Sequence, residues 1–385
     1  MTLYLDCNAS NLVDARVLDW MVDCYRDSFG NAGSPHAIGQ RAKDVVHRAR
    51  DQIATVVGGK RHEIVFTSGA TESNNLAILG LESHGLAVGK RHLVSTAIEH
   101  HAVIEPIQQL ERRGFEVTWI QPDADGRVSS TKVLQSIRPD TLLASVMHVN
   151  NETGIVQPIG QIAAGLEENP QFEPVWFHVD AAQGFTKELD SLRHRRIDMI
   201  SVSGHKVHGP QGIGALIARR RTGTLPPLRP LHHGGGQELG LRPGTLPVAL
   251  IGGFGLAAEL ALGELESRNQ RCQLIRQQLL EGLACLEPTL HGDQSACLPH
   301  VVNLSFPGWD SQRVIEALWG IAAVSDGAAC TSICASPSHV LTAMGIPSSC
   351  IDGSVRISWS AQTELSEIDQ TVQQIATHLK QAPIF

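Results

Sequence analysis

Short apolar runs alternate with helix-like patterns through the first two-thirds of the chain. The apolar runs are rich in β-branched residues, and the stretches 105–113 and 159–168 between them carry apolar residues at helical spacing. Strands that alternate with helices predict an α/β domain with a mostly parallel sheet. The predicted strands are Ile64–Phe66, His92–Ala97, Glu116–Ile120, Leu142–Val149, Val175–Val179, Met199–Ser203 and Ile213–Ile217.

The pattern changes after residue 225. A proline-rich stretch (225–230) and a glycine run (234–236) indicate a loop, and a long helical pattern then runs from about Val248 to Leu283. We expect this helix to connect the first domain to a smaller one that begins near residue 260. The smaller domain has strand-like runs of its own, Val301–Phe306 and Ser354–Trp359.

The composition excludes several classes of protein. A chain of 385 residues with 42% hydrophobic and 18% charged residues can bury the cores of about two to three domains. Its 31 basic and 39 acidic residues give a net charge of −8, which excludes a broad basic surface for nucleic acid. Eight cysteines are too few for a disulfide scaffold, so we expect reduced thiols.

The N-terminus and the apolar stretches argue against export and against a membrane span. The first residues lack the basic and apolar regions of a secretory signal. The most apolar window, Leu246–Ala258, is shorter than the roughly 18 residues of a membrane span and contains Pro247. We therefore expect a cytoplasmic protein that does not enter a membrane and does not bind nucleic acid directly.

Lys206 is the first residue that suggests a particular chemistry. It follows the predicted strand Met199–Ser203 in the string Ser203-Gly-His-Lys, and glycines around it allow close approach of a bulky ligand. A desolvated lysine amine forms Schiff bases with aldehyde cofactors. This segment alone is described more simply as a lysine that reaches solvent beside a Gly-Pro turn.

Two other strand ends change that balance. Asp180 follows the strand Val175–Val179, and an aspartate against the pyridine nitrogen of pyridoxal phosphate (PLP) keeps that nitrogen protonated. Thr67-Ser-Gly-Ala-Thr leads from a strand into a helix, whose N-terminal amides form a phosphate site. Alone, Asp180 is also a typical helix N-cap, and the turn is an ordinary one. Because the ends of parallel strands meet at one edge of a sheet, the three together favour PLP.

Polar residues follow two more strands. His100 follows His92–Ala97, and a neutral imidazole there could stack on a cofactor ring or move protons. Asn151 follows the strand that contains Met147 and could reach the phenolic oxygen of PLP. Both residues are equally compatible with ordinary loop polarity.

With these residues assembled, the chain resembles the NifS/IscS-type cysteine desulfurases, in the class V aminotransferase group of fold-type I PLP-dependent enzymes. The resemblance runs from Leu3-Tyr-Leu-Asp to Ser354-Val-Arg-Ile-Ser, nearly the whole chain. The strings that carry it are Thr67-Ser-Gly-Ala-Thr-Glu-Ser-Asn, His148-Val-Asn-Asn-Glu, His178-Val-Asp-Ala-Ala-Gln, Ser203-Gly-His-Lys, Arg242-Pro-Gly-Thr and Ala329-Cys-Thr-Ser.

The resemblance implies an architecture. It implies an α/β large domain (13–258) with a mostly parallel, seven-stranded sheet between helices. A smaller α+β C-terminal domain (259–385) would carry a catalytic cysteine, and an N-terminal segment (1–12) would pack with this small domain. A homodimer is also implied, because the second subunit would complete the active site.

The resemblance also implies a role for each site residue. Lys206 would bind PLP covalently, Asp180 would pair with the ring nitrogen, and His100 would stack on the ring. Gln183 and Asn151 would contact the ring oxygen. The phosphate ligands would be Ala70, Thr71, Ser203 and His205, with Thr245 of the neighbouring subunit.

The implied reaction converts L-cysteine to L-alanine. Arg356 would bind the substrate carboxylate, a bidentate task suited to guanidinium, with Asn151 beside it. The Cys330 thiolate would attack the substrate sulfur, keep it as a persulfide and pass it to an acceptor protein. A free thiol has a pKa of about 8.5, so activation is needed, and His100 is a plausible proton acceptor. No metal site is predicted.

The chain departs from the family pattern at three places. Ala9-Ser10-Asn11-Leu12 replaces the usual Ala-Thr-Thr-Pro, a change that concerns packing of the substrate pocket. Asp326 stands where many members have serine, which could raise the pKa of the Cys330 thiol or set partner choice. Cys334 is an extra thiol that could resolve a persulfide or simply be packed.

Other functions compete with this interpretation. The same scaffold could serve a selenocysteine lyase or a transaminase, and transamination needs no thiol. A metal-binding or sulfur-carrier protein could use Cys330, Cys334 and histidines, although one Cys-x₃-Cys pair is weak evidence for a metal. A catalytically silent scaffold is a third alternative, against which Lys206, Asp180 and Cys330 argue.

The destination of the sulfur stays open. Iron–sulfur cluster assembly, tRNA thiolation and DNA phosphorothioation are the routes that the resemblance allows. The strings Leu5-Asp-Cys-Asn-Ala and Phe29-Gly-Asn-Ala-Gly-Ser are similar to those of the phosphorothioation branch.

Overall fold

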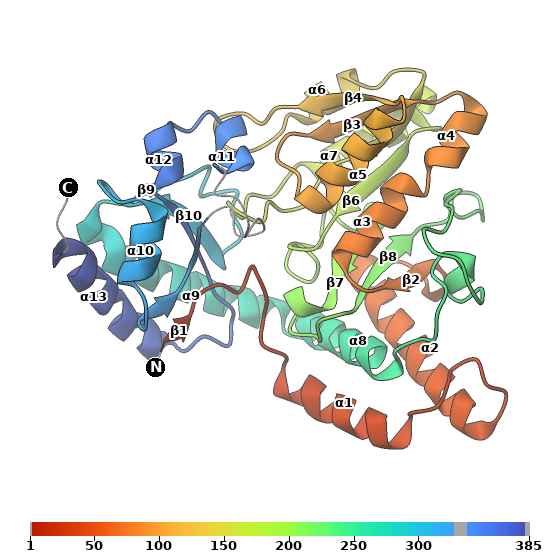
Figure 1. Cartoon of the computed structure of the whole chain (residues 1–385), viewed down its shortest axis with the longest axis horizontal. Coiled ribbons are helices and arrows are strands. Elements are labelled where there is room, and N and C mark those ends of the chain that lie inside the picture. Colours follow the sequence, from red (N-terminus) through yellow and green to blue (C-terminus); the bar gives the residue numbers. More distant parts are fainter. Residues whose placement is uncertain (1, 327–336, 382–385) are drawn as a thin grey trace.

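The computed structural model describes residues 2–326 and 337–381, and its largest element is a seven-stranded sheet (Figure 1). Its strands are β2 (Ile64–Thr67), β3 (His92–Thr96), β4 (Glu116–Ile120), β5 (Thr141–Ser145), β6 (Trp176–Asp180), β7 (Met199–Ser203) and β8 (Gly214–Ala218). They lie in the order β2-β8-β7-β6-β5-β3-β4. β8 runs antiparallel to both of its neighbours and the other pairs are parallel. The predicted α/β fold with a mostly parallel seven-stranded sheet is confirmed.

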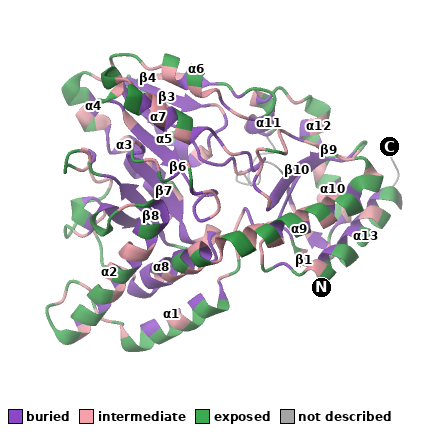
Figure 2. Ribbon diagram, turned by 180° about the vertical axis from the view of Figure 1, so that it is seen from behind, coloured by how far each residue is buried: buried purple, intermediate pink, exposed green. Residues whose placement is uncertain are grey.

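Helices cover both faces of this sheet. They are α1 (Ala15–Asp27), α2 (Ala37–Val57), α3 (Ala70–Leu79), α4 (Glu82–Val88), α5 (His101–Arg112), α6 (Ser130–Gln135), α7 (Ile159–Glu168) and α8 (Val248–Gly263). Because successive side chains of a strand point to opposite faces, Ile200 packs with α1, α2, α7 and α8, whereas Met199 packs with α3 and α5. The inner strands β6, β7 and β8 are accordingly buried along nearly their whole length (Figure 2).

The single helix predicted from Val248 to Leu283 is wrong, because the structure breaks it at Glu264. α8 ends at Gly263, α9 (Leu265–Leu283) begins at once, and their axes differ by 74°. The Glu264 carboxylate holds the bend through Arg16 of α1 (2.6 Å) and Arg268 of α9 (2.8 Å). Within the described residues no single helix is long and apolar enough to cross a membrane, although this bent pair meets that test of length and composition.

The C-terminal region has its own antiparallel sheet, which confirms the smaller α+β unit. Its order is β12-β13-β10-β9, and β1 from the N-terminus pairs in parallel with β11 beside it. Leu5 lies in the hydrophobic core of this region. The strands are β1 (Leu3–Tyr4), β9 (Thr289–Leu290), β10 (Val301–Ser305), β11 (Ala322–Ala323), β12 (Ser325–Asp326) and β13 (Ser354–Ser358). The helices besides α9 are α10 (Ser311–Ala317), α11 (His339–Ala343), α12 (Ser348–Asp352) and α13 (Leu365–Gln381).

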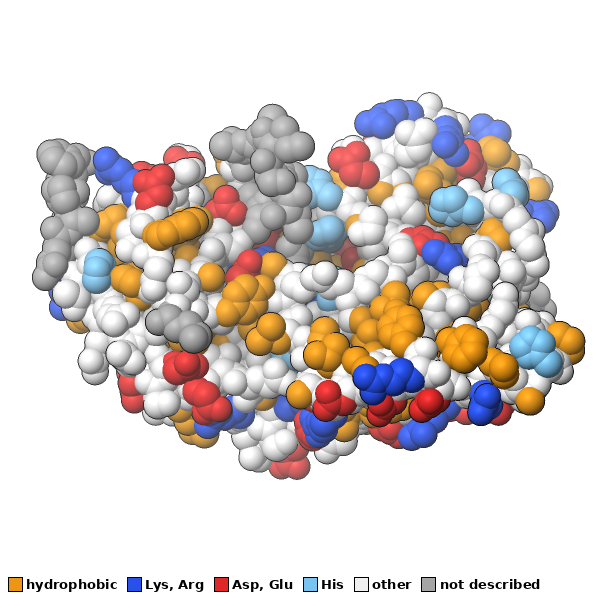
Figure 3. All heavy atoms as spheres, turned by 60° about the horizontal axis from the view of Figure 1, so that its bottom comes forward, with side chains coloured by type: hydrophobic (Ala, Val, Ile, Leu, Met, Phe, Trp, Pro, Cys, Tyr) orange, Lys and Arg blue, Asp and Glu red, His pale blue; other side chains and the backbone are white. Residues whose placement is uncertain are grey.

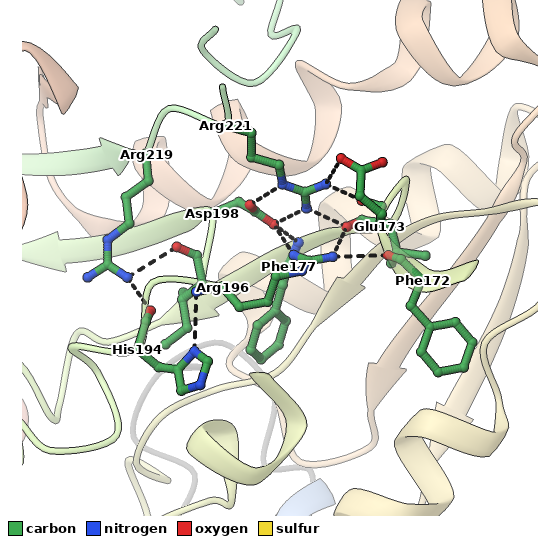
Figure 4. A network of polar contacts seen from close by, with 10 residues as sticks. Phe172, Glu173, Phe177, His194, Arg196, Asp198, Arg219 and Arg221 are labelled. Carbon is green, nitrogen blue, oxygen red and sulfur yellow. Dashed lines mark hydrogen bonds and ion pairs between the residues drawn. The ribbon is translucent and has the colours of Figure 1, made fainter. Parts of the chain in front are cut away.

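A buried ion-pair network holds the edge of the large sheet at which β6 and β7 begin, which we call the basal edge (Figure 4). Asp198 precedes β7, and its carboxylate accepts hydrogen bonds from Arg196 (2.7 Å), Arg221 (2.5 Å) and the Phe177 amide (2.7 Å). The Arg221 guanidinium also lies 4.2 Å from the centre of the Trp176 ring. This network ties the starts of β6 and β7 to the segment that follows β8.

Candidate active site

A cavity of about 660 Å³ lies at the opposite edge of the sheet, where β2, β3, β6 and β7 end; we call this the site edge. Parallel strands bring their carboxyl ends together, so the segments that follow them share one cleft. The N-terminal segment and the C-terminal region close the cavity through Asn8–Ser10 and Arg356. The predicted residues that line it are Ala70, Thr71, His100, Asn151, Asp180, Gln183, Ser203, His205, Lys206 and Arg356.

Lys206 reaches the cavity from a 3₁₀ turn, Gly204–Lys206, directly after β7. Its Nζ donates hydrogen bonds to the carbonyl oxygens of Asn8 and Ala9, the latter at 2.8 Å. The lysine amine is therefore held where the N-terminal segment crosses the cavity. Gly214 in β8 lets the turn at Gly69 lie against the sheet, because an added Cβ would lie 2.5 Å from the Val202 oxygen and 2.6 Å from the Gly69 Cα.

Asp180 ends β6 with its carboxylate fixed by two donors. Its Oδ1 accepts from the Ala182 amide at 2.9 Å, and its Oδ2 accepts from the Asn74 Nδ2 at 2.7 Å. The side chain also lines the cavity. The two donors come from different elements, so together they fix the orientation of the carboxylate in the cavity.

His100 is the N-cap of α5. Its Nδ1 accepts a hydrogen bond from the Ala102 amide at 3.0 Å, which places the proton of the neutral ring on Nε2. Burial lowers the pKa of His100, so the ring is neutral near pH 7. A neutral, flat ring suits stacking, and its exchangeable proton lies on Nε2.

The start of α3 provides an anion-binding end to the cavity. Ala70 and Thr71 begin this helix after Gly69, and the helix has no side-chain cap on its first amides. Ser203 and His205 lie beside them, and the His205 Nδ1 is 3.2 Å from the Ser10 hydroxyl. Burial and the nearby Lys206 lower the pKa of His205 to about 4, so its ring is neutral.

Thr245 lies outside this cavity. It is exposed and lines a neighbouring hollow of about 780 Å³ with Arg242 and Glu72. Ser68 and Thr71 line both the hollow and the cavity. Thr245 of this chain is thus placed away from its own Lys206, on an open surface next to the helix start.

Arg356 enters the cavity from β13 and is almost fully buried. Its Nη2 donates to Asp6 at 2.7 Å and its Nη1 to the Asn151 carbonyl oxygen at 3.1 Å. The Asn8 Nδ2 donates to the same carbonyl at 3.1 Å. These contacts fix the guanidinium from behind while its side chain lines the cavity.

Cys330 and Cys334 lie outside the described residues. The described chain reaches β12, where Ser325 pairs with Arg356 and Asp326 with Val355, and it resumes at residue 337. The Asp326 that departs from the family pattern is exposed. The strand before the cysteine string therefore lies next to the strand that carries Arg356.

Three site residues were not assigned from the sequence: Asn8, Asn74 and Glu99. The sequence contains a feature that could have identified Asn74: it follows Ala70 by one helical turn and so shares a face of the helix with it. Glu99 had none, since a glutamate before His100 reads as an exposed loop residue. The Glu99 side chain is fully buried, accepts from Thr96 and from the Met147 amide, and has its pKa raised by burial to about 8.

The chain matches the family model "Aminotransferase class-V" over residues 3–371. It is 40% identical to the cysteine desulfurase IscS of Vibrio vulnificus (strain YJ016) over 380 residues, which cover 97% of this chain and 92% of IscS. The structure of a NifS-like protein is similar with a TM-score of 0.90 and 35% identity, covering 99% of this chain and 100% of that one. DndA from Streptomyces lividans is similar with a TM-score of 0.80 and 45% identity, covering 91% and 98%.

The chain therefore belongs to the class V aminotransferase family, a family of PLP-dependent enzymes. Within that family it is a cysteine desulfurase.

The described residues fit PLP. A lysine, a carboxylate and an uncapped helix start line one cavity, as an aldehyde, a ring nitrogen and a phosphate require. Among the described residues, no group of three or more His, Cys, Asp or Glu side chains could hold a metal ion. Buried polar atoms around the cavity without a hydrogen-bond partner among the described residues are Asn8 Oδ1, Asn74 Oδ1, Gln183 Oε1 and Arg356 Nε.

Proposed function

We propose that this enzyme moves sulfur from L-cysteine to Cys330 and then to an acceptor protein. The observation that carries the proposal is the convergence of Lys206, Asp180 and Arg356 on one cavity. PLP, when bound, supplies an electron sink that weakens the bond between the substrate Cβ and sulfur. The rest of the reaction depends on residues of this chain.

The residues that line the cavity would hold the cofactor as follows. Lys206 would bind the aldehyde carbon, Asp180 would pair with the ring nitrogen, and the neutral His100 ring would stack on the cofactor ring. Gln183 and Asn151 would contact the ring oxygen; the Gln183 Nε2 donates to the Asn8 carbonyl at 3.0 Å, which orients its amide. The phosphate would be bound by Ala70, Thr71, Ser203 and His205, with Thr245 of a second copy.

Arg356 binds the substrate carboxylate, and Asn151 lies beside it. Because Asp6 and the Asn151 carbonyl hold the guanidinium from behind, its orientation is set before the substrate arrives. This places the substrate between Arg356 and Lys206, with its thiol free to meet a nucleophile.

The Cys330 thiolate attacks the substrate sulfur. A sulfur–sulfur bond forms, the Cβ–S bond breaks, and its electron pair stays on carbon, which takes up a proton to give alanine. The His100 Nδ1 is engaged with the Ala102 amide, so proton exchange by His100 runs through Nε2. The persulfide sulfur then passes to a thiol of the acceptor protein.

A homodimer completes the site. Thr245 is exposed next to the helix start that holds the phosphate, where a second copy can supply it in exchange. α1 adds an apolar stripe, since Leu18, Val22 and Tyr25 are exposed at helical spacing. Figure 3 shows the underside of the molecule in Figure 1, where apolar side chains gather among charged ones. Sedimentation should give a dimer, and a monomer with full cofactor affinity contradicts this step.

The proposal also includes the pathway that receives the sulfur. Of iron–sulfur assembly, tRNA thiolation and DNA phosphorothioation, we favour phosphorothioation on the strings at Leu5 and Phe29. The domain division 1–12, 13–258 and 259–385 and a cytoplasmic location belong to the same proposal. The free thiols of Cys7, Cys24, Cys272, Cys285, Cys297 and Cys350 support a reducing compartment.

The test is a mixture of the PLP-loaded enzyme, L-cysteine and a thiol reductant. We expect equal amounts of alanine and sulfide, and, without reductant, one added sulfur atom on the peptide that contains Cys330. Cys330→Ala should bind PLP and L-cysteine but release no alanine. Full turnover by Cys330→Ala contradicts the desulfurase step, and activity with L-selenocysteine alone favours a selenocysteine lyase.

A further inference from the structure

We propose that Asn74 is a positioning residue that holds Asp180 for the cofactor ring. The inference rests on the proposed pairing of Asp180 with the ring nitrogen and goes beyond it, because it assigns Asn74 a role toward the carboxylate. The Asn74 Nδ2 orients that carboxylate by donating a hydrogen bond to it.

The Asn74–Asp180 contact is short and fully inside the protein. The Asn74 Nδ2 lies 2.7 Å from the Asp180 Oδ2, and Asn74 has no exposed surface. The amide cannot be turned over, because its oxygen would then face a carboxylate oxygen. The Ala182 amide holds the other carboxylate oxygen at 2.9 Å, so two donors from different elements define the carboxylate plane.

The oxygen of the Asn74 amide shows that an asparagine at this position lowers the stability of the fold. The Asn74 Oδ1 is buried without a hydrogen-bond partner among the described residues. A buried polar atom without a partner destabilises a protein, and an apolar side chain would avoid the penalty. An asparagine at this position is therefore explained by what its N–H group does for Asp180, and not by the packing of α3.

Asp180 stands among other titratable groups of the site. Lys206 and His100 line the same cavity. Burial raises the pKa of the neighbouring Glu99 to about 8, so this carboxyl group is protonated near pH 7. Asn74 contributes a neutral donor that contacts the Asp180 carboxylate directly.

Asn74 also joins the two ends of the cofactor site on one rigid element. It lies in α3, whose first residues, Ala70 and Thr71, form the phosphate end of the cavity. Four residues correspond to about 6 Å along a helix axis. The phosphate end and the Asp180 carboxylate are thus fixed relative to each other through α3.

The experiment compares Asn74→Leu and Asn74→Ala with the wild type and with a matched control, Asn75→Ala. Asn75 is the half-buried neighbour on the same helix, whose Nδ2 donates to the Thr71 carbonyl. The readouts are the protonation of the ring nitrogen, measured by ¹⁵N NMR of enzyme loaded with labelled PLP, and thermal unfolding of the apoprotein.

Loss of the donor should lower the protonated fraction of the ring nitrogen and weaken PLP binding by about tenfold, the worth of one charge-assisted hydrogen bond. Asn74→Leu should unfold at a temperature close to that of the wild type, because the loss of the unpaired oxygen offsets the loss of the donor to Asp180. Asn75→Ala should change neither readout. A purely structural role predicts the reverse: a loss of stability with unchanged ring protonation.

A second pair of variants separates this inference from the proposed function. Asp180→Asn should abolish ring protonation, and if it does not, the pairing of Asp180 with the ring is wrong. If Asp180→Asn abolishes protonation while Asn74→Leu and Asn74→Ala keep it, Asn74 is not a positioning residue. Asn74→Asp with Asp180→Asn restores the hydrogen bond with the charge displaced, and the ring should stay unprotonated.

Discussion

At the basal edge of the large sheet, both carboxylate oxygens of Asp198 accept hydrogen bonds from arginines. At the site edge of the same strands, buried polar atoms of Asn8, Asn74, Gln183 and Arg356 have no partner among the described residues. The two edges share β6 and β7 and a common core. The two edges differ in how far the described chain satisfies their buried polar groups.

The titratable groups show the same contrast. At the site edge, burial raises the pKa of Glu99 to about 8 and that of Glu152 to about 7. At the basal edge, Arg196 and Arg221 compensate the charge of Asp198 directly. The carboxylate at the basal edge is thus paired with cations, whereas the two carboxyl groups at the site edge accept hydrogen bonds from neutral donors.

The largest effect should come from Lys206→Ala. Removal of the amine takes away the covalent attachment of the cofactor, so alanine production should fall on the order of 1,000-fold or more. Thermal unfolding of the apoprotein should be nearly unchanged, because the hydrogen bonds that the Lys206 amine donates to Asn8 and Ala9 reach a short N-terminal segment. A Lys206→Ala enzyme that keeps a tenth of the wild-type activity would contradict the role of Lys206 at the site edge.

Asp198→Asn should have the next largest effect, on stability alone. It leaves Arg196 and Arg221 buried without their counter-charge, which typically costs about 3–5 kcal/mol of unfolding free energy. Chemical denaturation measures this loss, and kcat should equal that of the wild type. A variant with normal stability would show that the basal network does not hold the sheet.

Glu99→Gln should change the pH dependence of stability. The unfolded glutamate ionises near pH 4.3, but folded Glu99 stays protonated up to about pH 8. The folded state therefore binds one more proton between these values, and its stability falls as pH rises through that window. Glu99→Gln removes this contribution, so urea unfolding at pH 5 and pH 8 should differ less than in the wild type. An unchanged difference contradicts the assignment.

Asp51→Asn should give the smallest effect. The Arg61 Nε lies 2.8 Å from the Asp51 carboxylate, but both side chains are half exposed. Such pairs contribute less than about 1 kcal/mol, so unfolding and activity should both stay close to wild type. This variant is the exposed counterpart of Asp198→Asn. If both variants lost the same free energy of unfolding, burial of the ion pair at the basal edge would not matter for stability.

Much of the site edge could be predicted from the sequence, because its residues follow strands that have a clear pattern. Lys206, Asp180 and Thr71 stand directly after apolar runs, and parallel strands bring such positions together. The fold class followed from the same alternation.

Other features depend on contacts between distant residues and left no local signal. The helical pattern is continuous through Glu264, and the bend becomes visible only when Arg16, far away in the sequence, is placed against it. Asn74 and Asp180 are separated by 106 positions. Asp198 and Arg221 are separated by 23 positions, and their pairing depends on the fold placing β7 beside β8.

The identity of the lysine that binds the cofactor is the central point to test. Lys206 is the predicted one, and Lys187 is the strongest alternative, because burial lowers its pKa to about 8 and so favours a reactive amine. Borohydride reduction of the PLP-loaded enzyme, followed by peptide mapping, identifies the labelled lysine. We expect the pyridoxyl group on the peptide that contains Lys206. A label on Lys187, or on no lysine, would contradict the assignment.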